Sequence, residues 1–492
     1  MQRFYLAVTN SFRKNPMLFF VCVIILSALM HLHVFNRDLV GVHVWRQSQT
    51  QINIENFAFN DFNILNTKSY SLHHPDFLLR YEFPLMQWIF ACFYKLFGNH
   101  IIISRVLTFL IGIFSVVGMY KLLKSLFNNS IINLAGAWAF CFSPVFYYYI
   151  VNPLPDNLAL CTGIWSLYYF FSYINKETIA KMLLSFLFLS LAVLSKLPFV
   201  IYAVPWLIYF IRHLKKQPVA VIKKSVCMFI FLFPAGCWYL WVISGWKGNG
   251  ILTGFMGTEN TGIMEMLNIL QANLVSTLPE LLLNYGSLIF FITGLIVVFR
   301  FKLYKTERGM YLASLGMAVI AYFIFEMNMI GTVHDYYLFP FLPLLFILVG
   351  FGFNVLMKKQ SGFVKGFAGF CLIILPITAF LRINDRWNTK SPGFNKDLYS
   401  FKTEFRNSIP DDAFCIAGND RSTHIWPYYL HRKCWSFTDN TIKEEVFVAY
   451  CNMGAKYLVS DSRELEAKPF VQSHLKGLVI ERGSIKVFEL SP

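Results

Sequence analysis

The chain has 492 residues, of which 56% are hydrophobic and only 14% are charged, and its formal net charge is +16. Soluble domains average roughly 45–50% apolar and 25% charged residues, so this composition excludes an ordinary soluble protein and indicates a polytopic membrane protein. The positive charge does not indicate a nucleic-acid partner, because most basic residues form short clusters between apolar runs, as in cytoplasmic loops.

The N-terminal segment predicts an uncleaved signal anchor, because basic residues precede the apolar run 17–33 and no small-x-small cleavage site follows it. A spanning helix needs about 20 apolar residues, and several of the later runs are short for that length. We predict about eleven spans, or thirteen if the shortest segments also cross. The later runs are 101–120, 131–150, 157–174, 179–195, 198–211, 224–243, 286–300, 310–328, 337–357 and 363–382.

The first outer loop, residues 34–100, contains two segments that predict helices lying along the membrane surface. Residues 45–58 carry Arg46 and a ladder of amides, and residues 82–98 are short and contain a glutamine and a lysine. An amphipathic interfacial helix needs no further crossing. Counting 82–98 as a span would also place the basic residues at 121–124 outside, against the positive-inside rule. The N-terminus is therefore predicted inside and the C-terminus outside.

With this topology, polar side chains from distant segments fall at the outer membrane face. Ionisable groups at span ends are costly unless they face a cavity or a partner, so their gathering predicts an active site. Interfacial snorkelling and loop solvation are the alternatives for any single residue. The set is His43, Arg46, Gln49, Glu82, Arg105, Asp156, Lys196, His334 and Asp335.

The Gly-rich segment 245–285 becomes amphipathic towards its end, and a lid over the site is one interpretation of a loop this long. From about 385 the composition changes to that of a soluble α/β domain. We therefore divide the chain into a membrane module, 1–384, and an outward-facing domain, 385–492. In the latter, strands are predicted at 413–418, 456–460 and 485–490, with a helix at 441–455.

The ten cysteines show no CxxC spacing, so neither a zinc site nor a redox motif is indicated. Cys415, Cys434 and Cys451 fall in the predicted soluble domain, where a disulfide between two of them and buried thiols are both open. No cofactor or metal is predicted, although a divalent metal is not excluded.

Four stretches, in this order, resemble the membrane glycosyltransferases of the GT-C superfamily. The resemblance is to the branch holding the protein O-mannosyltransferases and the lipid A aminoarabinose transferase, which is glycosyltransferase family 39-like. It covers residues 1 to about 380. The stretches are WRQSQTQINIENF (45–57), YEFPLMQWIFACFYKLFG (81–98) with a following Ser-Arg at 104–105, NPLPDNLAL (152–160) and HDYYLFPFLPLLFIL (334–348), and LAVLSKLPFVIYAVP (191–205) is also similar to a segment of the family.

The resemblance implies an inverting enzyme that moves a sugar from a polyprenyl-phosphate donor to a lipid, polysaccharide or protein acceptor of the cell envelope. It implies a multi-pass protein of the bacterial inner membrane that acts on the outer face, with the donor, the acceptor and membrane lipids as partners. A sugar phosphodiester needs cations that hold the phosphate and offset the leaving-group charge. Arg46, Arg105 and Lys196 are the outward-facing candidates. A solvated span start for Arg105 and an interfacial lysine for Lys196 are the alternatives.

A base near the attacked carbon would activate the acceptor, and here the sequence departs from the family it resembles. Members of that family commonly carry an Asp or an Asp-Glu pair at the head of the first loop helix, where this chain has Arg46 and Gln47, and Asp38 lies before that helix. We therefore predict Glu82 and Asp156 as the catalytic carboxylates, with Glu55 as a further candidate. The alternatives are an ion pair for Glu82 and a helix cap for Asp156.

The remaining polar and aromatic residues of the matched stretches are predicted to contact substrate, although His334 and Asp335 could instead fix a loop. A transporter or flippase of lipid-linked sugars is a second hypothesis, but no internal repeat is present and the polar residues fall at one face. A polymerase or ligase with a lipid-linked substrate is a third. The predicted substrate contacts are His43, Trp45, Gln49, His334, Asp335 and Tyr336.

Overall fold

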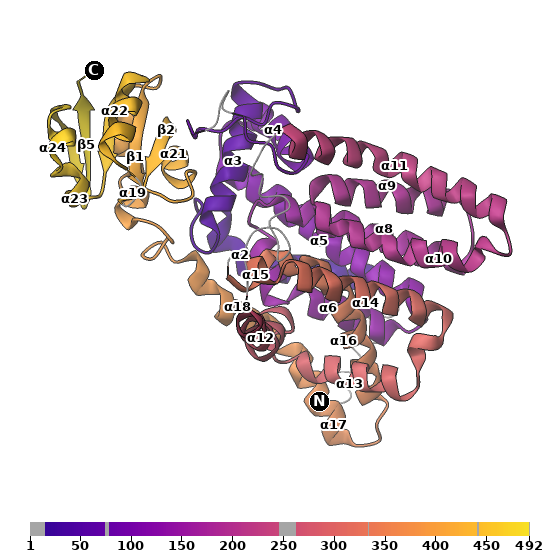
Figure 1. Cartoon of the computed structure of the whole chain (residues 1–492). Coiled ribbons are helices and arrows are strands. Elements are labelled where there is room, and N and C mark those ends of the chain that lie inside the picture. The colour runs from indigo at the N-terminus through magenta and orange to yellow at the C-terminus, as the bar shows by residue number, and fades with distance from the viewer. Residues whose placement is uncertain (1–14, 74–77, 246–261, 333, 440–441, 492) are drawn as a thin grey trace. The chain divides into compact units, whose positions relative to one another are not determined.

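The computed structural model describes the whole chain except residues 1–14, 74–77, 246–261, 333, 440–441 and 492 (Figure 1). The chain divides into two compact units, each described here by itself. Unit 1 is Met1–Asn36, Tyr81–Phe83 and Arg105–Ile383, and unit 2 is Arg37–Arg80, Pro84–Ser104 and Asn384–Pro492.

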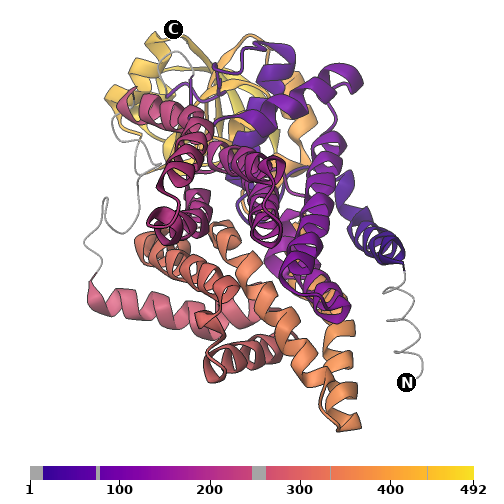
Figure 2. The ribbon, with the colours of Figure 1, turned by 90° about the vertical axis from the view of Figure 1, so that its right-hand side faces the viewer.

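Unit 1 is helical, and Figure 1 and Figure 2 show its helices from two directions. Its α-helices are α2 (Pro16–Phe35), α5 (Ile101–Leu126), α6 (Ser130–Cys141), α7 (Pro144–Tyr149), α8 (Pro155–Asn175), α9 (Ile179–Ser195), α10 (Val204–Leu214), α11 (Pro218–Gly245), α12 (Ile263–Ala272), α13 (Leu288–Arg300), α14 (Glu307–Phe325), α15 (Met327–Thr332), α16 (Leu342–Met357), α17 (Gly362–Ile373) and α18 (Leu375–Ile383). The 3-10 turns are η2 (Leu197–Ala203), η5 (Leu303–Lys305) and η6 (Asp335–Phe341), and η4 (Asn273–Leu282) is a π-helix.

Among the described residues, seven helical segments are long and apolar enough to cross a membrane, and the protein is therefore a multi-pass membrane protein. Four shorter apolar helices also occur, and the count of about eleven spans stays a prediction. The seven segments are Pro16–Phe35, Ile101–Leu126, Leu197–Leu214, Pro218–Gly245, Glu307–Phe325, Asp335–Met357 and Gly362–Trp387.

The apolar run 131–150, expected as one helix, is broken into α6 and α7. The break falls at Ser143, whose backbone is extended, and Pro144 then occupies the first turn of α7. A proline disfavours helical geometry in the residue before it, which explains the interruption. Glycines bring the neighbouring helices α13 and α16 together, because a side chain at Gly294 or Gly352 would collide with the facing backbone.

Unit 2 contains a five-stranded sheet in the order β2-β1-β3-β5-β4. The strands β2, β1 and β3 are parallel, and β5 pairs antiparallel with both β3 and β4. The strands are β1 (Phe414–Asn419), β2 (Lys433–Phe437), β3 (Ala455–Ser460), β4 (Leu475–Arg482) and β5 (Ile485–Leu490). The helices are α3 (Val44–Phe59), α4 (Leu85–Phe97), α19 (Lys396–Ser400), α20 (Lys402–Ser408), α21 (Ile425–Leu430), α22 (Glu444–Asn452), α23 (Arg463–Glu466) and α24 (Pro469–Gln472), and η7 (Asn384–Trp387) is a 3-10 turn.

The N-terminal part of unit 2, Arg37–Arg80, packs onto this sheet. Leu39, Val44 and Ile52 belong to the same apolar core as Trp426 and Tyr429 of α21. Residues 70–72 run beside β2, where Cys434 donates its N–H to the Tyr70 carbonyl and accepts from the Leu72 N–H, both at 2.9 Å. This contact covers the edge of β2 that would otherwise expose unpaired backbone groups.

Three of the five strands lie where the sequence predicts them, and the predicted helix 441–455 is the shorter α22. All ten cysteines are free thiols, and the three in this part of unit 2 are buried. Part of the predicted lid 245–285, residues 246–261, lies outside the described residues, and the remainder contains α12 and η4.

Candidate active site

A lysine–aspartate pair lies at the centre of the polar groups of unit 1. Lys196 follows the end of α9 with extended backbone, just before the Leu197-Pro198 turn, and Asp156 lies in the first turn of α8 after Pro155. The Lys196 Nζ is 3.6 Å from the Asp156 Oδ1, and the side chains are 14% and 2% exposed. Such a pair is costly to desolvate, so its retention favours a functional over a merely stabilising role.

The segment that begins at His334 forms an aromatic wall beside this pair. The Lys196 Nζ lies 5.0 Å from the ring centre of Tyr337 and 5.7 Å from that of Tyr336, within cation–π range. His334 Nδ1 and the Tyr336 hydroxyl share a 3.0 Å hydrogen bond. The Tyr149 hydroxyl donates to Asp335 Oδ1 at 2.5 Å and so ties this wall to α7.

Glu326 is a buried carboxyl group of unit 1 that the sequence analysis missed. It follows the last residue of α14, is 5% exposed, and its Oε2 has no hydrogen-bond partner among the described residues. The charge of Lys196 acts on this carboxyl group. The available signal was a lone acid in the apolar run 310–328, which is a functional hypothesis by default.

Arg105 and Glu82 also lie in unit 1, and both are buried. Arg105 Nη1 donates to the Val151 carbonyl at 3.1 Å and to Asn152 Oδ1 at 2.7 Å, which fixes the connection that leads into α8 and Asp156. The Phe83 N–H donates to the Leu194 carbonyl at 3.0 Å, which holds the segment of Glu82 beside the end of α9. A phosphate contact for Arg105 and a base role for Glu82 stay predictions.

The other predicted site residues lie on or next to α3, in unit 2. His43 precedes α3 with a left-handed backbone (φ 56°), and Trp45 packs against the core of the sheet. Arg46 Nη1 donates to Gln49 Oε1 one turn along the helix, and both residues are buried. Their roles towards substrate also stay predictions.

α3 continues into a buried polar network that contains Glu55. Gln51, Tyr94 and Ser104 form a closed triangle of hydrogen bonds, each 2.9 Å long. Gln51 Nε2 also donates to Glu55 Oε1 at 3.3 Å, whereas Glu55 Oε2 has no partner among the described residues. Burial raises the pKa of Glu55 to about 7, so this carboxyl titrates near neutral pH.

Asp38, the acid nearest to the start of α3, is fully engaged within unit 2. It accepts hydrogen bonds from the Lys402 ammonium, from the Tyr428 hydroxyl at 2.6 Å and from the Leu39 N–H at 2.8 Å. Burial alone would raise its pKa, but the charge of Lys402 and these hydrogen bonds outweigh burial and lower the pKa below its usual value. Asp38 is therefore a charged, saturated structural group. In the described part of the chain, no group of three or more His, Cys, Asp and Glu side chains could hold a metal ion.

Comparison with known proteins places this geometry in context. Residues 73–241 match the family model described as dolichyl-phosphate-mannose-protein mannosyltransferase. The fold resembles ArnT from Cupriavidus metallidurans, in the apo state at TM-score 0.64 and 12% identity, over 96% of this chain and 97% of that one. The same protein bound to undecaprenyl phosphate gives TM-score 0.65 at 11% identity, over the same shares. The chain therefore has an ArnT-like fold.

The fold also resembles AglB, the oligosaccharyltransferase from Archaeoglobus fulgidus, in complex with an inhibitory peptide and a dolichol-phosphate. That likeness has a TM-score of 0.59 at 14% identity and covers 92% of this chain and 70% of that one. No curated protein matches the chain by sequence. The polytopic α-helical fold expected from the motifs is thus confirmed, and the likeness to ArnT covers nearly the full length of the chain.

Proposed function

We propose that the chain is an inverting glycosyltransferase that moves a sugar from a polyprenyl-phosphate donor to an acceptor of the cell envelope. Support comes from the match to a mannosyltransferase family and from the fold, which it shares with an ArnT bound to undecaprenyl phosphate and an AglB bound to a dolichol-phosphate. We place the reaction on the outer face of the bacterial inner membrane, with the N-terminus in the cytoplasm, because the basic clusters between the apolar runs favour that orientation.

The observation that carries the proposal is the buried ammonium of Lys196 against Asp156 and the tyrosine wall of η6. A donor of this class leaves as a polyprenyl phosphate, and a cation in a water-poor site lowers the cost of the charge that develops on it. Asp156 lies close enough to orient the ammonium, and the aromatic wall limits its hydration. Arg46 and Arg105 are further candidates for phosphate contact.

The acceptor would attack the anomeric carbon from the side opposite the phosphate, forming the new glycosidic bond while the carbon–phosphate oxygen bond breaks. The acceptor's proton goes to a carboxylate, for which Glu82 and Asp156 are the predicted groups. Glu326 joins them as a candidate, because it is buried and its Oε2 has no hydrogen-bond partner among the described residues. We assign substrate contact to His43, Trp45, Gln49, His334, Asp335 and Tyr336.

The test is a transfer assay with the purified protein in detergent and a panel of radiolabelled polyprenyl-phosphate sugars. The variants Arg46→Ala, Glu82→Gln and Asp156→Asn are assayed beside the wild type, with donor binding measured separately. We expect sugar transfer or release with at least one donor, weaker donor binding in the arginine variant, and loss of turnover with retained donor binding in the variant that removes the base.

Two results would contradict the proposal or its assignments. Movement of intact donor lipid across liposomes, without transfer or release of any sugar, would make the chain a transporter. Unchanged turnover in both carboxylate variants would exclude Glu82 and Asp156 as bases and leave Glu326 and Glu55 as the candidates.

A further inference from the structure

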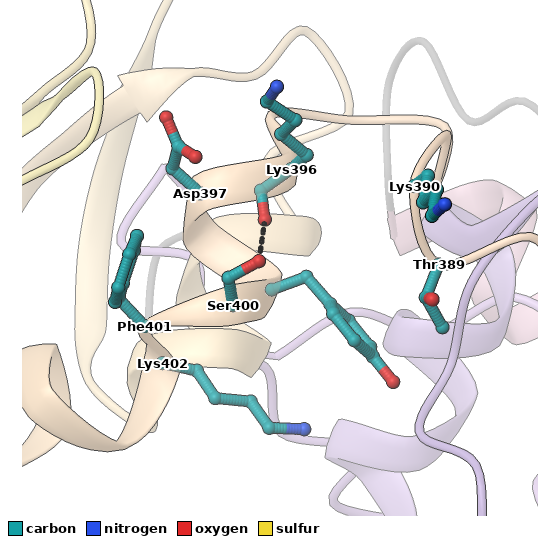
Figure 3. Close-up of a pocket in the computed structure, with 8 residues that line it drawn as sticks. Thr389, Lys390, Lys396, Asp397, Ser400, Phe401 and Lys402 are labelled. Carbon is teal, nitrogen blue, oxygen red and sulfur yellow. Dashed lines mark hydrogen bonds between the residues drawn. The ribbon is translucent and has the colours of Figure 1, made fainter.

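A pocket of about 780 Å³ lies within unit 2, away from α3 in sequence and formed by one continuous segment of the chain. It is bounded by α19, by the first residue of α20 and by the turn that contains Thr389 and Lys390 (Figure 3). Its volume lies within the range of roughly 300–1,000 Å³ of small-molecule sites in proteins. None of the predicted site residues lines it.

Three lysines line this pocket and only one acid. Lys402 is already held by Asp38, whereas Lys390 and Lys396 form no ion pair within the described part of the chain. The acid, Asp397, accepts hydrogen bonds from the N–H and the hydroxyl of Ser484, each at 2.8 Å. Figure 3 shows the Asp397 carboxylate on the side of α19 opposite to the Lys402 ammonium. The hydrogen bonds from Ser484 and the charge of Lys396 together lower the pKa of Asp397, so Lys396 is partly balanced by that carboxylate. Lys390 has no ion-pairing carboxylate in the described part of the chain.

The backbone that carries these two lysines is fixed on both sides. The Lys390 N–H donates to Asn388 Oδ1 at 2.9 Å, and the Ser391 N–H donates to the Asn388 carbonyl at 3.1 Å. On the other side, Ser400 Oγ donates to the Lys396 carbonyl at 3.0 Å. Because this frame is formed before any ligand arrives, binding would order only the lysine side chains.

The remaining lining residues add aromatic faces and hydroxyl groups to the cations. Tyr399 and Phe401 supply rings, and Thr389 and Ser400 supply hydroxyls. Rings pack against the apolar face of a sugar, hydroxyls exchange hydrogen bonds with its hydroxyls, and ammonium groups bind phosphate or carboxylate as point charges. A neutral sugar would leave the two lysines unused, and a bare inorganic anion would leave the rings unused.

We infer that this pocket binds an acidic saccharide, a sugar unit that bears phosphate or carboxylate, and that this unit belongs to the acceptor of the transfer reaction. The second half of the inference rests on the proposed function, and the first half does not. The acceptor is thereby defined as an anionic glycan, which the motifs and the fold leave open.

Calorimetric titration of the full-length protein in detergent tests the binding half. The probes are trigalacturonate for carboxylate, mannose 6-phosphate for phosphate, and neutral maltotriose. We expect at least one acidic probe to bind at least tenfold more tightly than maltotriose, and which of the two it is identifies the anionic group. The double variant Lys390→Glu/Lys396→Glu should lose at least tenfold in that affinity, and Lys390→Gln/Lys396→Gln should lose less.

The matched control is Lys443→Glu/Lys456→Glu, which makes the same charge change at two exposed lysines of unit 2 outside the pocket. It should keep the affinity of the wild type. Equal losses in the two Glu double variants would mean general charge attraction and would overturn the inference, as would binding of maltotriose as tight as that of both acidic probes, or no binding of either acidic probe.

The acceptor half has a separate readout. In the transfer assay, the Lys390→Glu/Lys396→Glu variant should raise the acceptor KM at least tenfold while release of sugar from the donor to water is unchanged. An unchanged acceptor KM overturns the acceptor half. If no donor is turned over although an acidic probe binds through the two lysines, the proposed function and the acceptor half fail, and the pocket stands as an acidic-saccharide site.

Discussion

Each unit contains a lysine–aspartate pair that joins distant segments of the chain, and these two pairs differ in the groups that surround the two charges. In unit 2, Lys402 donates to Asp38, and the carboxylate also accepts from Tyr428 and Leu39. In unit 1, Lys196 and Asp156 lie 3.6 Å apart, beyond hydrogen-bonding distance. The first pair has the contacts of a structural lock, whereas the second has the looser spacing of a pair into which a ligand can enter.

The surroundings of the two lysines point the same way. Lys402 lies near the rings of Tyr399 and Tyr429, both of them bound into the core of the sheet. Lys196 lies over the wall of η6 and acts on a second buried carboxyl group, Glu326. When one lysine faces two carboxyl groups, its single charge cannot balance both, so one of the two can take up a proton. Asp38, which is matched by Lys402 and saturated with hydrogen bonds, stays charged. Chemical environment, more than residue type, therefore separates a candidate catalytic pair from a structural one.

The largest expected effect is the loss of turnover when Lys196 is replaced. If turnover did not fall, the proposed difference between the two lysine–aspartate pairs would be wrong. Lys196→Gln removes the charge but keeps a hydrogen-bond donor near Asp156, and we expect turnover to fall roughly 1,000-fold, or about 4 kcal/mol, as when a transition-state charge loses its partner. Steady-state transfer from the active polyprenyl-phosphate sugar measures this.

The matched control for that prediction is Lys402→Gln, the same substitution in the other pair. It should lower the melting temperature of the purified protein while the turnover of the folded fraction at saturating acceptor stays within about threefold of the wild type. The acceptor must be saturating because Lys402 lines the proposed acceptor pocket and can change the acceptor KM. Equal losses of turnover in both variants would show that the two pairs do not differ in function.

The second prediction concerns Glu55, whose burial lowers the stability of the folded protein. It tests whether unit 2 contains a functional acid. The folded-state pKa of about 7 lies above the unfolded value of about 4.3, so the stability of the fold falls as pH rises from about 4.3 to about 7 and is then constant. Glu55→Gln should therefore differ little from the wild type at pH 4 and be more stable by up to about 3 kcal/mol at pH 8. Thermal unfolding across this pH range measures the difference.

Turnover decides what that gain in stability means. If Glu55→Gln keeps wild-type turnover, Glu55 is only a costly buried group, and the comparison stands with function in unit 1. Loss of turnover in a more stable variant would move a catalytic role to α3.

A smaller effect tests the lock in unit 2 directly. Asp38→Asn leaves the Lys402 ammonium without its counter-charge, and we expect a loss of about 2 kcal/mol, below the usual value for a fully buried pair because both side chains are partly exposed. The folded-state pKa of Asp38 is lowered, so its contribution is present above the unfolded value of about 3.9 and disappears as pH falls through the folded value. The penalty measured by thermal unfolding should therefore shrink below about pH 4, and a penalty that does not depend on pH would contradict the assignment.

The sequence predicted the fold best where a local pattern suffices. The bounds of α3 were expected at 45–58 and lie at Val44–Phe59, because the amide-rich segment is bounded by a turn at each end. The strands β1, β3 and β5 were predicted because their centres are apolar, whereas β4 is a largely exposed edge strand that contains Gly477. β2 is only five residues long and begins with Lys433, so its apolar signal is short.

The candidate site was predicted less completely, because local sequence patterns do not show which distant residues come into contact. Lys196, Asp156 and the residues after His334 were predicted as neighbours because all lie at span ends that topology assigns to one face, and the structure brings them together in unit 1. The Asp38–Lys402 pair joins residues 364 positions apart and leaves no local pattern to recognise. Glu326 was not predicted, because it lies in the apolar run 310–328, and one acidic residue changes the mean hydropathy of such a run very little.

The smallest effect is expected at Glu326. This prediction tests whether the second acid near Lys196 takes part in the reaction, which would further distinguish the pair in unit 1 from the pair in unit 2. Glu326 is a buried carboxyl group whose Oε2 has no hydrogen-bond partner among the described residues, so it is placed to accept a proton from the acceptor. Glu326→Gln removes this base, so we expect turnover at pH 8 to fall about tenfold, or about 1.4 kcal/mol, and to lose the rise with pH that a titrating base would give the wild type. A pH–rate profile of both proteins measures this. A parallel downward shift with the rise intact would instead make Glu326 a positioning residue that keeps Lys196 in place, and unchanged rates would leave Asp156 as the only functional partner of that lysine.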